Sequence, residues 1–485
     1  MLAFMALMAP TIINYQPYPI QWDEAYYATR IACMNHAVYG GGVRDIVDCL
    51  AGAHKGPIME VLSLPWGPVG GGEAGIGLAF VSLAVLLWLL AWATYATQIR
   101  SGAPAWGLVL AAACICATPF TRAASGSLMT DMLVGWSTAL SLAFIPLEYA
   151  EPQKALRASL LRGLLWGIAL TVGALSKVTF LAFFLPIGLV LLWLRWRRSG
   201  LRPLAWALVG AFIAFLPALV IWSLFGRTFL DFAMNSAFGA TGAPYRVPGM
   251  TLARFVADYF KALGLALVPL AVLLILFVRS LFSQRTGWAW RLVPVGIVLM
   301  YLGISSRTGM QEWRYLLPVM LSLPLALTWT PGGQVGRNPG SVAFLISMIV
   351  GFYLAVPMVA KPALMPLRHA RELMESLTHG APMEIMFALD GPDYNHEVFQ
   401  LARHTAYKRF QPVIVDTLAY DEINKRSLAE SLDRAARSDY LLFLKPGFTL
   451  GPAYTRTRTD EFRKLAETKG KKLDVSSEYD VYQMH

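Results

Sequence analysis

Charged residues are scarce in this chain. Asp, Glu, Lys and Arg make up 15% of its 485 residues, whereas 56% are hydrophobic. A soluble domain carries roughly 25% charged residues, and here long apolar runs recur from Ala74 to Tyr353. This composition excludes an ordinary soluble protein and indicates a polytopic α-helical membrane protein.

The net charge of +11 does not require a nucleic-acid partner. Much of the excess Lys and Arg falls in short clusters between apolar runs. That distribution is what the positive-inside rule produces in membrane proteins. We therefore expect a membrane around the chain and no nucleic acid among its partners.

Cysteine is also scarce, with four residues in the chain. Cys33 and Cys49 both fall in the first polar stretch, so they can form a disulfide if that stretch faces an oxidising compartment. Two unpaired, buried cysteines are an equally good interpretation. Cys114 and Cys116 lie two residues apart in an apolar helix, where they point to different faces and suit no metal site.

A cleavable signal peptide is not evident. The run Met1–Tyr15 lacks a basic n-region and a small-residue cleavage site. It is also short for a membrane span, which needs roughly 20 residues. We expect either a tilted or thinly anchored first span, or a start that has been clipped.

Apolar runs predict about eleven membrane spans. Lys and Arg collect in every second connection between them. By the positive-inside rule these basic connections are cytoplasmic, which puts the N-terminus inside and the C-terminus outside. The predicted spans are 1–15, 74–98, 103–120, 127–147, 160–175, 178–194, 203–225, 257–279, 292–305, 315–330 and 339–360.

The longest outer connection within this transmembrane part is the loop 16–73. Ala25–Val38 has helical spacing and predicts a short helix at the membrane interface, which Gly40–Gly42 ends. Residues 56–76 are rich in Gly and Pro and predict an irregular return to the next span. A second outer loop, 226–256, is rich enough in Gly and Pro to close over a bound donor.

After Lys361 the charge density rises and β/α alternation appears. We therefore expect two domains, a transmembrane domain 1–360 and an extracytoplasmic soluble α/β domain 361–485. No residue within the second domain stands out. The predicted strands are Glu384–Leu389, Pro412–Asp416 and Tyr440–Leu444, and the predicted helices are Glu422–Ala436 and Asp460–Thr468.

Ionisable residues gather at the outer ends of the predicted spans. Such groups are costly at membrane depth and usually mark a site. The basic ones run against the positive-inside trend, so something on that face should compensate them. A lipid-linked phosphate would do so; a set of structural ion pairs is the plain alternative. The acids are Asp23, Glu24 and Asp131, the last a few residues inside its span, and the bases are Lys55, Arg122, Lys177, Arg307 and Arg314.

Five short motifs resemble those of the C-fold glycosyltransferases that use polyprenyl-phosphate sugars. Trp22–Tyr27 resembles their acidic first-loop motif, and Lys55–Pro57 resembles a Lys-Pro-Pro-like element of the same loop in the bacterial branch. Ser127–Asp131 resembles the second acidic motif, which opens a span, and Ala174–Thr179 and Trp313–Pro318 match further recurring elements. The resemblance is to the protein O-mannosyltransferase superfamily, which includes lipid A aminoarabinose transferases.

This resemblance implies that an acceptor hydroxyl attacks the anomeric carbon of a lipid-linked sugar and displaces the lipid phosphate with inversion. Asp23 takes the family's leading acidic position and is expected to be the base, with Glu24 in support. A carboxylate becomes a stronger base where desolvation raises its pKa. Asp131 would orient a base or the sugar, or join Asp23 around a divalent cation such as Mg or Mn.

The resemblance also implies cations at the leaving phosphate, where they offset developing charge. Lys offers a point charge there, and Arg offers a planar fork. The candidates are Lys55 first, and then Arg122, Lys177 and Arg314.

Aromatic residues on the outer face are candidates for stacking on the sugar, namely Tyr26, Tyr27, Trp66, Tyr245 and Tyr315. Many relatives in the aminoarabinose branch carry an arginine shortly after the acidic pair. Here Tyr26 and Tyr27 hold those positions, and Arg30 follows one turn further on.

Two other classes of function stay open. A transporter or lipid flippase of envelope glycolipids usually shows inverted repeats and charges near the bilayer midplane, whereas here the charges gather at one surface and no repeat is visible. A non-catalytic relative whose outer domain binds a partner is the other; the retained acids and Lys55 count against it. We expect a multi-pass enzyme of the inner (cytoplasmic) membrane, with a polyprenyl-phosphate sugar donor and a lipid, glycan or protein acceptor outside.

Overall fold

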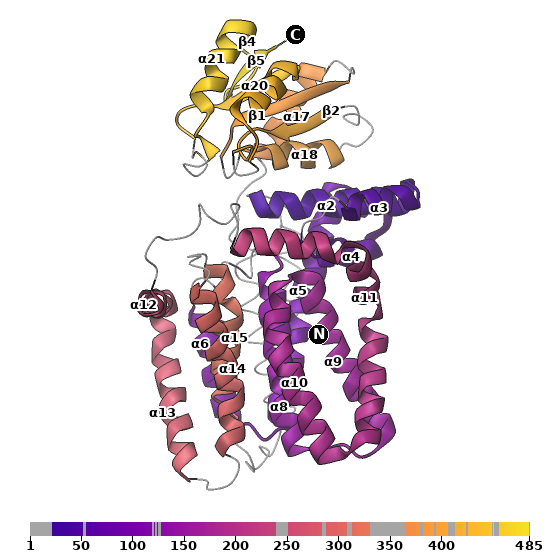
Figure 1. Ribbon diagram of the computed structural model, residues 1–485, viewed down its shortest axis with the longest axis vertical. Helices are drawn as coiled ribbons and strands as arrows, with labels where there is room; N and C mark the ends of the chain where they lie inside the picture. Colours follow the sequence, from indigo (N-terminus) through magenta and orange to yellow (C-terminus); the bar gives the residue numbers. More distant parts are fainter. Residues whose placement is uncertain are drawn as a thin grey trace.

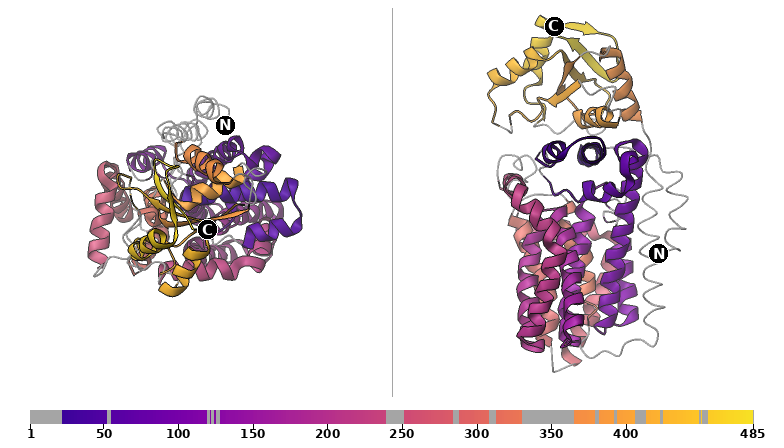
Figure 2. Two further views of the ribbon diagram at one scale, coloured as in Figure 1. Left: turned by 90° about the horizontal axis from the view of Figure 1, so that it is seen from above. Right: turned by 90° about the vertical axis from the view of Figure 1, so that its right-hand side faces the viewer.

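The computed structural model of the chain has three layers (Figure 1). Long helices form a bundle, shorter helices lie across one end of that bundle, and an α/β unit covers the shorter helices (Figure 2). The structure describes residues 22–51, 55–118, 121, 124, 128–238, 251–283, 288–307, 313–329, 365–378, 382–391, 394–405, 413–422, 425–448, 450 and 455–484.

Six helices of the described residues are long and apolar enough to cross a membrane. Together with shorter apolar helices they correspond to the predicted spans from 74–98 to 315–330. The predicted spans 1–15 and 339–360 lie outside the described residues, so the total of about eleven stays a prediction. The bundle consists of α5 (Glu73–Arg100), α6 (Ala105–Ala117), α8 (Asp131–Ala150), α9 (Leu156–Ser176), α10 (Thr179–Ser199), α11 (Leu201–Ala237), α13 (Leu267–Ser283), α14 (Trp288–Arg307) and α15 (Leu317–Ala326). Helix α12 (Leu252–Leu263) lies crosswise at one end of α13, to which η3 (Gly264–Ala266) joins it (Figure 1).

Helix α11 is longer than the sequence predicted. It continues to Ala237, whereas the predicted span ended at 225 and the predicted loop covered 226–256. No glycine or proline follows Gly226 within the helix to end it, and Phe229 is fully buried. The loop is therefore much shorter than predicted, and its remaining residues 239–250 lie outside the described set.

The two ends of the bundle carry different ionic groups. Near the end of α8, the carboxylate of Glu148 pairs with Arg162 at 3.1 Å and with Arg195 at 2.7 Å. Both arginines come from connections that the sequence predicted to be cytoplasmic. Asp131 begins α8 at the opposite end, about 25 Å away along the helix axis.

Helix α2 lies across the end of the bundle, as Figure 1 shows. The sequence predicted a helix at the membrane interface, but no residue from Glu24 to Ala37 is exposed. The bundle covers one side of α2 and the α/β unit covers another. The predicted irregular return over 56–76 contains two short helices. This middle layer comprises α2 (Trp22–Gly40), α3 (Val43–Ala51), α4 (Ile58–Ser63) and the 3-10 helix η1 (Leu64–Gly71).

A disulfide joins Cys33 of α2 to Cys49 of α3. The sequence left two alternatives open for these cysteines, a disulfide or two unpaired thiols, and the structure has the disulfide. Because the chain reverses between these helices at Gly41 and Gly42, the bond fixes the end of α2 that is remote from the acidic pair. Disulfides persist in oxidising compartments, in keeping with a loop on the outer side.

The α/β unit contains a five-stranded sheet of order β2-β1-β3-β5-β4. Strands β2, β1 and β3 are parallel, and β5 and β4 add antiparallel partners. The three predicted strands agree with β1, β2 and β3. The elements are α17 (Met365–Thr378), β1 (Met383–Leu389), α18 (His396–Thr405), β2 (Val413–Thr417), α20 (Leu428–Arg437), β3 (Tyr440–Leu444), α21 (Thr459–Lys469), β4 (Lys471–Leu473) and β5 (Tyr479–Gln483).

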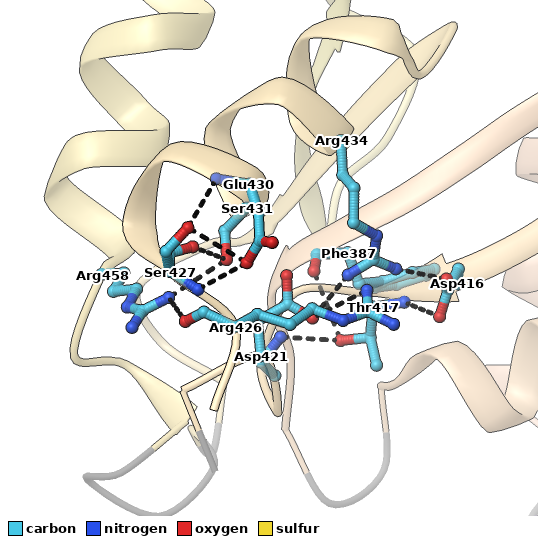
Figure 3. Close-up of polar contacts among 11 residues, drawn as sticks. Phe387, Asp416, Thr417, Asp421, Arg426, Ser427, Glu430, Ser431, Arg434 and Arg458 are labelled. Carbon is cyan, nitrogen blue, oxygen red and sulfur yellow. Dashed lines mark hydrogen bonds and ion pairs between the residues drawn. The ribbon is translucent and has the colours of Figure 1, made fainter. Parts of the chain in front are cut away.

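Helix α20 begins at Leu428, later than the predicted start at Glu422. The side chain of Ser427 accepts from the backbone N–H of Glu430 at 3.2 Å, and the Glu430 carboxylate accepts from the backbone N–H of Ser427 at 2.8 Å (Figure 3). This capping box satisfies N–H groups that the first turn leaves free. It therefore sets the start of the helix.

Arginines bind two acids, one within β2 and one shortly after it. Arg434 of α20 binds both Asp416 and Asp421, and Arg426 approaches Asp421 at 3.4 Å (Figure 3). These ion pairs connect α20 to the sheet, so they account for the charges at this edge within the α/β unit itself.

The α/β unit rests on α2 through α18. The Thr29 hydroxyl donates to the carbonyl of Glu397 at 3.4 Å, and Nε2 of His36 lies 2.9 Å from the carbonyl oxygen of His404. Both pairs are 368 positions apart in the sequence. The two helices therefore run side by side in the same direction, and the start of α18 lies beside Thr29, about two turns into α2.

Candidate active site

The acidic pair of the first motif lies in the first turn of α2. Glu24 is buried, and its Oε1 accepts a hydrogen bond from the backbone N–H of Leu128 at 2.9 Å. Leu128 belongs to the second motif. The side chain of Asp23 is outside the described set, but its backbone is adjacent to Glu24 in α2. The Glu24 bond therefore anchors the end of α2 that carries Asp23.

A second bond joins the same two motifs. The Tyr27 hydroxyl lies 2.9 Å from Oγ1 of Thr130, the residue that precedes α8. Asp131 is the first residue of α8, and does not lie inside the helix as the sequence predicted. An acid is favourable there because the N-terminal end of a helix carries partial positive charge.

Lys177 connects the second motif to the remaining ones. Its Nζ is 2.7 Å from Oδ1 of Asp131 and 4.5 Å from the centre of the Tyr315 ring. The guanidinium of Arg314 is 5.6 Å from that same ring. Lys177 follows the last residue of α9, and Tyr315 lies in η4 (Trp313–Leu316). The ring of Tyr315 thus has two cations within cation–π distance.

Lys55 meets the first motif. Its Nζ is 5.2 Å from the centre of the Tyr26 ring and 5.3 Å from that of Tyr27. The next residue, Gly56, packs so closely on the motif Ala174–Thr179 that a Cβ there would lie 2.0 Å from the carbonyl oxygen of Leu175. Only glycine fits without a shift of the backbone, so this contact fixes where Lys55 emerges.

The five motifs therefore meet at one end of the bundle, beneath the α/β unit. Buried carboxylates there can accept a proton from a hydroxyl, and clustered Lys and Arg side chains can bind a phosphate. The plain alternative, a structural ion pair, holds for Asp131 and Lys177, which bind each other.

The structure does not describe every predicted site residue. Arg122 and the side chain of Arg307 lie outside the described set, so their roles stay predictions. Within the described part of the chain, no group of three or more His, Cys, Asp or Glu side chains could hold a metal ion. Oδ1 of Asp131 is already engaged by the Lys177 ammonium. The divalent cation stays a prediction, and the chemistry below is derived from the side chains alone.

The sequence did not single out Glu60. This residue is buried in the first turn of α4, with Oε1 3.6 Å from Nε of Arg30 on α2. Burial raises the pKa of Glu60 to about 7, although the Arg30 charge opposes the rise. Perturbed carboxylates of this kind are frequent at functional sites. A lone acid in the apolar segment Ile58–Ser63 was the available signal, but only the fold brings Arg30 to it.

Comparison with known proteins gives a fold. No family model matches the sequence, and no curated protein matches it either. The structure of ArnT from Cupriavidus metallidurans in the apo state has a TM-score of 0.60 at 14% identity, over 100% of this chain and 97% of that one. The archaeal oligosaccharyltransferase AglB from Archaeoglobus fulgidus, in complex with an inhibitory peptide and a dolichol-phosphate, has a TM-score of 0.44 at 12% identity, over 91% of this chain and 69% of that one. The chain shares the fold of ArnT along its full length, which is the C-fold that the five motifs resemble.

Proposed function

We propose that this protein is an integral membrane glycosyltransferase. It moves a sugar from a polyprenyl-phosphate donor, of the undecaprenyl-phosphate type, to an acceptor hydroxyl on a lipid, glycan or protein. The reaction inverts the anomeric carbon and takes place on the extracytoplasmic face of the inner membrane. The fold shared with ArnT, a lipid A aminoarabinose transferase, supports this class of reaction.

The observation that carries the proposal is the meeting of the five motifs. Segments as far apart as residues 24 and 128, or 131 and 177, are joined by hydrogen bonds of 2.9 and 2.7 Å at one end of the bundle. A flippase needs no such assembly of carboxylates, cations and tyrosines on a single face.

Asp23 is the proposed base. Its neighbour Glu24 is buried and bound to the Leu128 N–H, so Glu24 holds α2 in place. The acceptor hydroxyl attacks the anomeric carbon and passes its proton to the Asp23 carboxylate. The bond between the anomeric carbon and the phosphate oxygen breaks, and its electron pair leaves with the lipid phosphate. Attack from the opposite face inverts the configuration.

Lys55 and Arg314 are the proposed phosphate contacts. Both lie against tyrosine rings, and these contacts limit how far their charges can move. A fixed cation beside the leaving phosphate stabilises the negative charge that develops there. Lys177 is paired with Asp131, and its contact with the Tyr315 ring positions that ring.

Transfer from a defined donor tests this function. Purified full-length protein in nanodiscs is mixed with radiolabelled undecaprenyl-phosphate sugars and an envelope extract as acceptor, and label that leaves the lipid is counted. A general base contributes about 10²–10⁴ in rate, so Asp23→Asn should lower transfer at least about a hundredfold. Lys55→Ala should lower it as well.

The matched control is Asp48→Asn, which changes an exposed acid in the same loop. Its transfer should equal that of the unaltered protein. Unchanged transfer by Asp23→Asn removes Asp23 as the base. Movement of an intact lipid-linked sugar across the membrane, with no label released from the lipid, favours the flippase instead.

A further inference from the structure

Arg30 and Glu60 form a buried ion pair beside the five motifs. Arg30 lies on α2 and Glu60 on α4, with Nε and Oε1 3.6 Å apart and side chains 10% and 2% exposed. Only the fold joins them, and the mechanism above uses neither.

The pair leaves hydrogen-bonding capacity unused. Among the residues that the structure describes, Nε and Nη2 of Arg30 and Oε2 of Glu60 are buried without a hydrogen-bond partner. A buried polar atom without a partner destabilises the fold, so a pair that served structure alone should satisfy more of these atoms. Both oxygens of Glu148, at the far end of the bundle, accept from arginines. Nε and Nη2 of Arg195 there are also without a partner in the described part of the chain, so the free carboxylate oxygen is what distinguishes Glu60 from Glu148.

The pair also lies close to the proposed phosphate contact. Arg30 follows Tyr26 by four residues and Tyr27 by three, and such residues are neighbours on a helix surface. Both tyrosine rings contact Lys55, and Glu60 lies in the first turn of α4, the helix that follows Lys55. One helical turn rises about 5.4 Å, which is the scale of a single sugar ring.

The unused atoms match hydroxyl groups better than a phosphate. A hydroxyl can accept from an Arg30 N–H and donate to Oε2 of Glu60, because it carries both a donor and acceptor lone pairs. A phosphate brings mainly acceptors, and an ionised Glu60 repels it. Adjacent hydroxyls on a sugar ring satisfy both partners at once.

We propose that Arg30 and Glu60 form a hydroxyl-binding subsite, which holds the sugar of the lipid-linked donor while Lys55 holds its phosphate. This inference rests on the proposed function. It assigns recognition of the sugar to Arg30 and Glu60, which lie outside the five motifs.

Equilibrium binding tests the subsite without any transfer. Full-length protein in nanodiscs is titrated with bare undecaprenyl phosphate, with undecaprenyl-phosphate mannose and with undecaprenyl-phosphate aminoarabinose. The unaltered protein should bind at least one sugar-bearing lipid more tightly than the bare lipid. Glu60→Gln should lower the affinity for that sugar-bearing lipid about tenfold, since one hydroxyl loses its carboxylate partner. It should change the affinity for the bare lipid less than about twofold. Lys55→Ala should lower the affinity for all three lipids.

Two further variants guard against loss of fold. Arg30→Lys keeps the charge opposite Glu60 but removes the fork, so it should also weaken only the sugar-bearing lipid. Glu151→Gln changes an ion-paired glutamate at the far end of the bundle and should weaken neither. Equal binding of bare and sugar-bearing lipids, or equal weakening of both by Glu60→Gln, overturns the subsite but leaves the phosphate site standing. Failure of the unaltered protein to bind any of the lipids overturns the proposed function as well.

Discussion

Asp131 depends on a single cation for its charge in the described structure. The carboxylate lies at the start of α8 with a side chain that is 7% exposed, and Lys177 is its ion-pair partner at 2.7 Å. Removing one member of a buried pair leaves an uncompensated charge and costs about 3–5 kcal/mol. We therefore expect Lys177→Met to lower the thermal midpoint of unfolding clearly.

The double variant Lys177→Met/Asp131→Asn separates structure from chemistry. It removes both charges, so it should recover most of the thermal stability while transfer stays low, because Tyr315 has still lost a cation. Stability that does not recover would show that the two side chains are not coupled. The thermal midpoint and transfer are measured on the same preparations.

Gly56 acts through its lack of a side chain. A Cβ at this position would lie 2.0 Å from the carbonyl oxygen of Leu175, a backbone atom that cannot rotate away. Gly56→Ala should therefore displace the Lys55 segment, cost about 1–3 kcal/mol and reduce binding of bare undecaprenyl phosphate. Gly42→Ala is the control, since a Cβ there would come no closer than 3.9 Å to a neighbour, Oδ2 of Asp45. Equal lipid binding by the two variants would contradict the argument.

At the scale of elements, the contact between α2 and α18 contains a pH-sensitive group. Burial lowers the pKa of His404 from 6.5 to about 3, and the charges of Arg403, His36 and Arg30 add to the effect. If α18 leaves α2, His404 regains an ordinary pKa near 6.5. Its contribution to docking is therefore complete above about pH 6.5, and about 2 kcal/mol of it is lost by pH 5.

Spin labels measure this loosening. With Cys114 and Cys116 changed to Ser, labels at Lys469→Cys on the α/β unit and Arg202→Cys at the far end of the bundle should show a broader distance distribution at pH 5 than at pH 8. His404→Gln should remove the difference. A distribution that is identical at both pH values would contradict the prediction.

A second histidine of the α/β unit serves as an internal check. Burial disfavours the charged form of His396, but hydrogen bonds to Asp390 and Glu397 outweigh it and raise its pKa to about 10. The contribution of His396 to the stability of the α/β unit is complete below pH 6.5 and is lost as the pH rises through about 10. His396→Gln should therefore leave the change between pH 6.5 and pH 5 intact.

Elements were predictable where their pattern is local. Strands β1 and β3 are short, buried and mostly apolar, and β2 is a short run rich in β-branched residues, so their sequence alone marked them. The end of α11 was missed because the apolar run that marks the membrane span ends before the helix itself ends. The start of α20 was missed because Ser427 and Glu430 form a capping box, which a search for amphipathic spacing does not weigh.

The candidate site divides in the same way. The order of the five motifs and the acids and bases within them were visible in the sequence. The bonds from Tyr27 to Thr130 and from Glu24 to Leu128 span more than a hundred positions, and no periodic pattern encodes such pairs. Arg30 was noted in the sequence one turn after the acidic motif, but Glu60 and its pairing with Arg30 were missed for the same reason, since the two residues are 30 positions apart on different helices.

At the scale of the whole molecule, the three layers predict a fixed orientation in the membrane. The arginines of the far end come from the basic connections, and the α/β unit lies at the opposite end (Figure 1). In the same cysteine background, a membrane-impermeant maleimide should label Lys469→Cys in intact spheroplasts. It should label Arg202→Cys only after lysis, and the reverse pattern would place the candidate site in the cytoplasm.

The pairing of α2 with α18 has a consequence for biosynthesis. The partners Thr29 and Glu397 are separated by 368 positions, so a ribosome completes the bundle before it makes the helix that covers α2. Chains of this size fold in stages, and surface that stays exposed between stages favours aggregation. Until α18 is made, α2 is therefore held only by earlier elements, which are the bundle, α4, η1 and the disulfide to α3. A prematurely terminated chain never acquires the helix that covers α2.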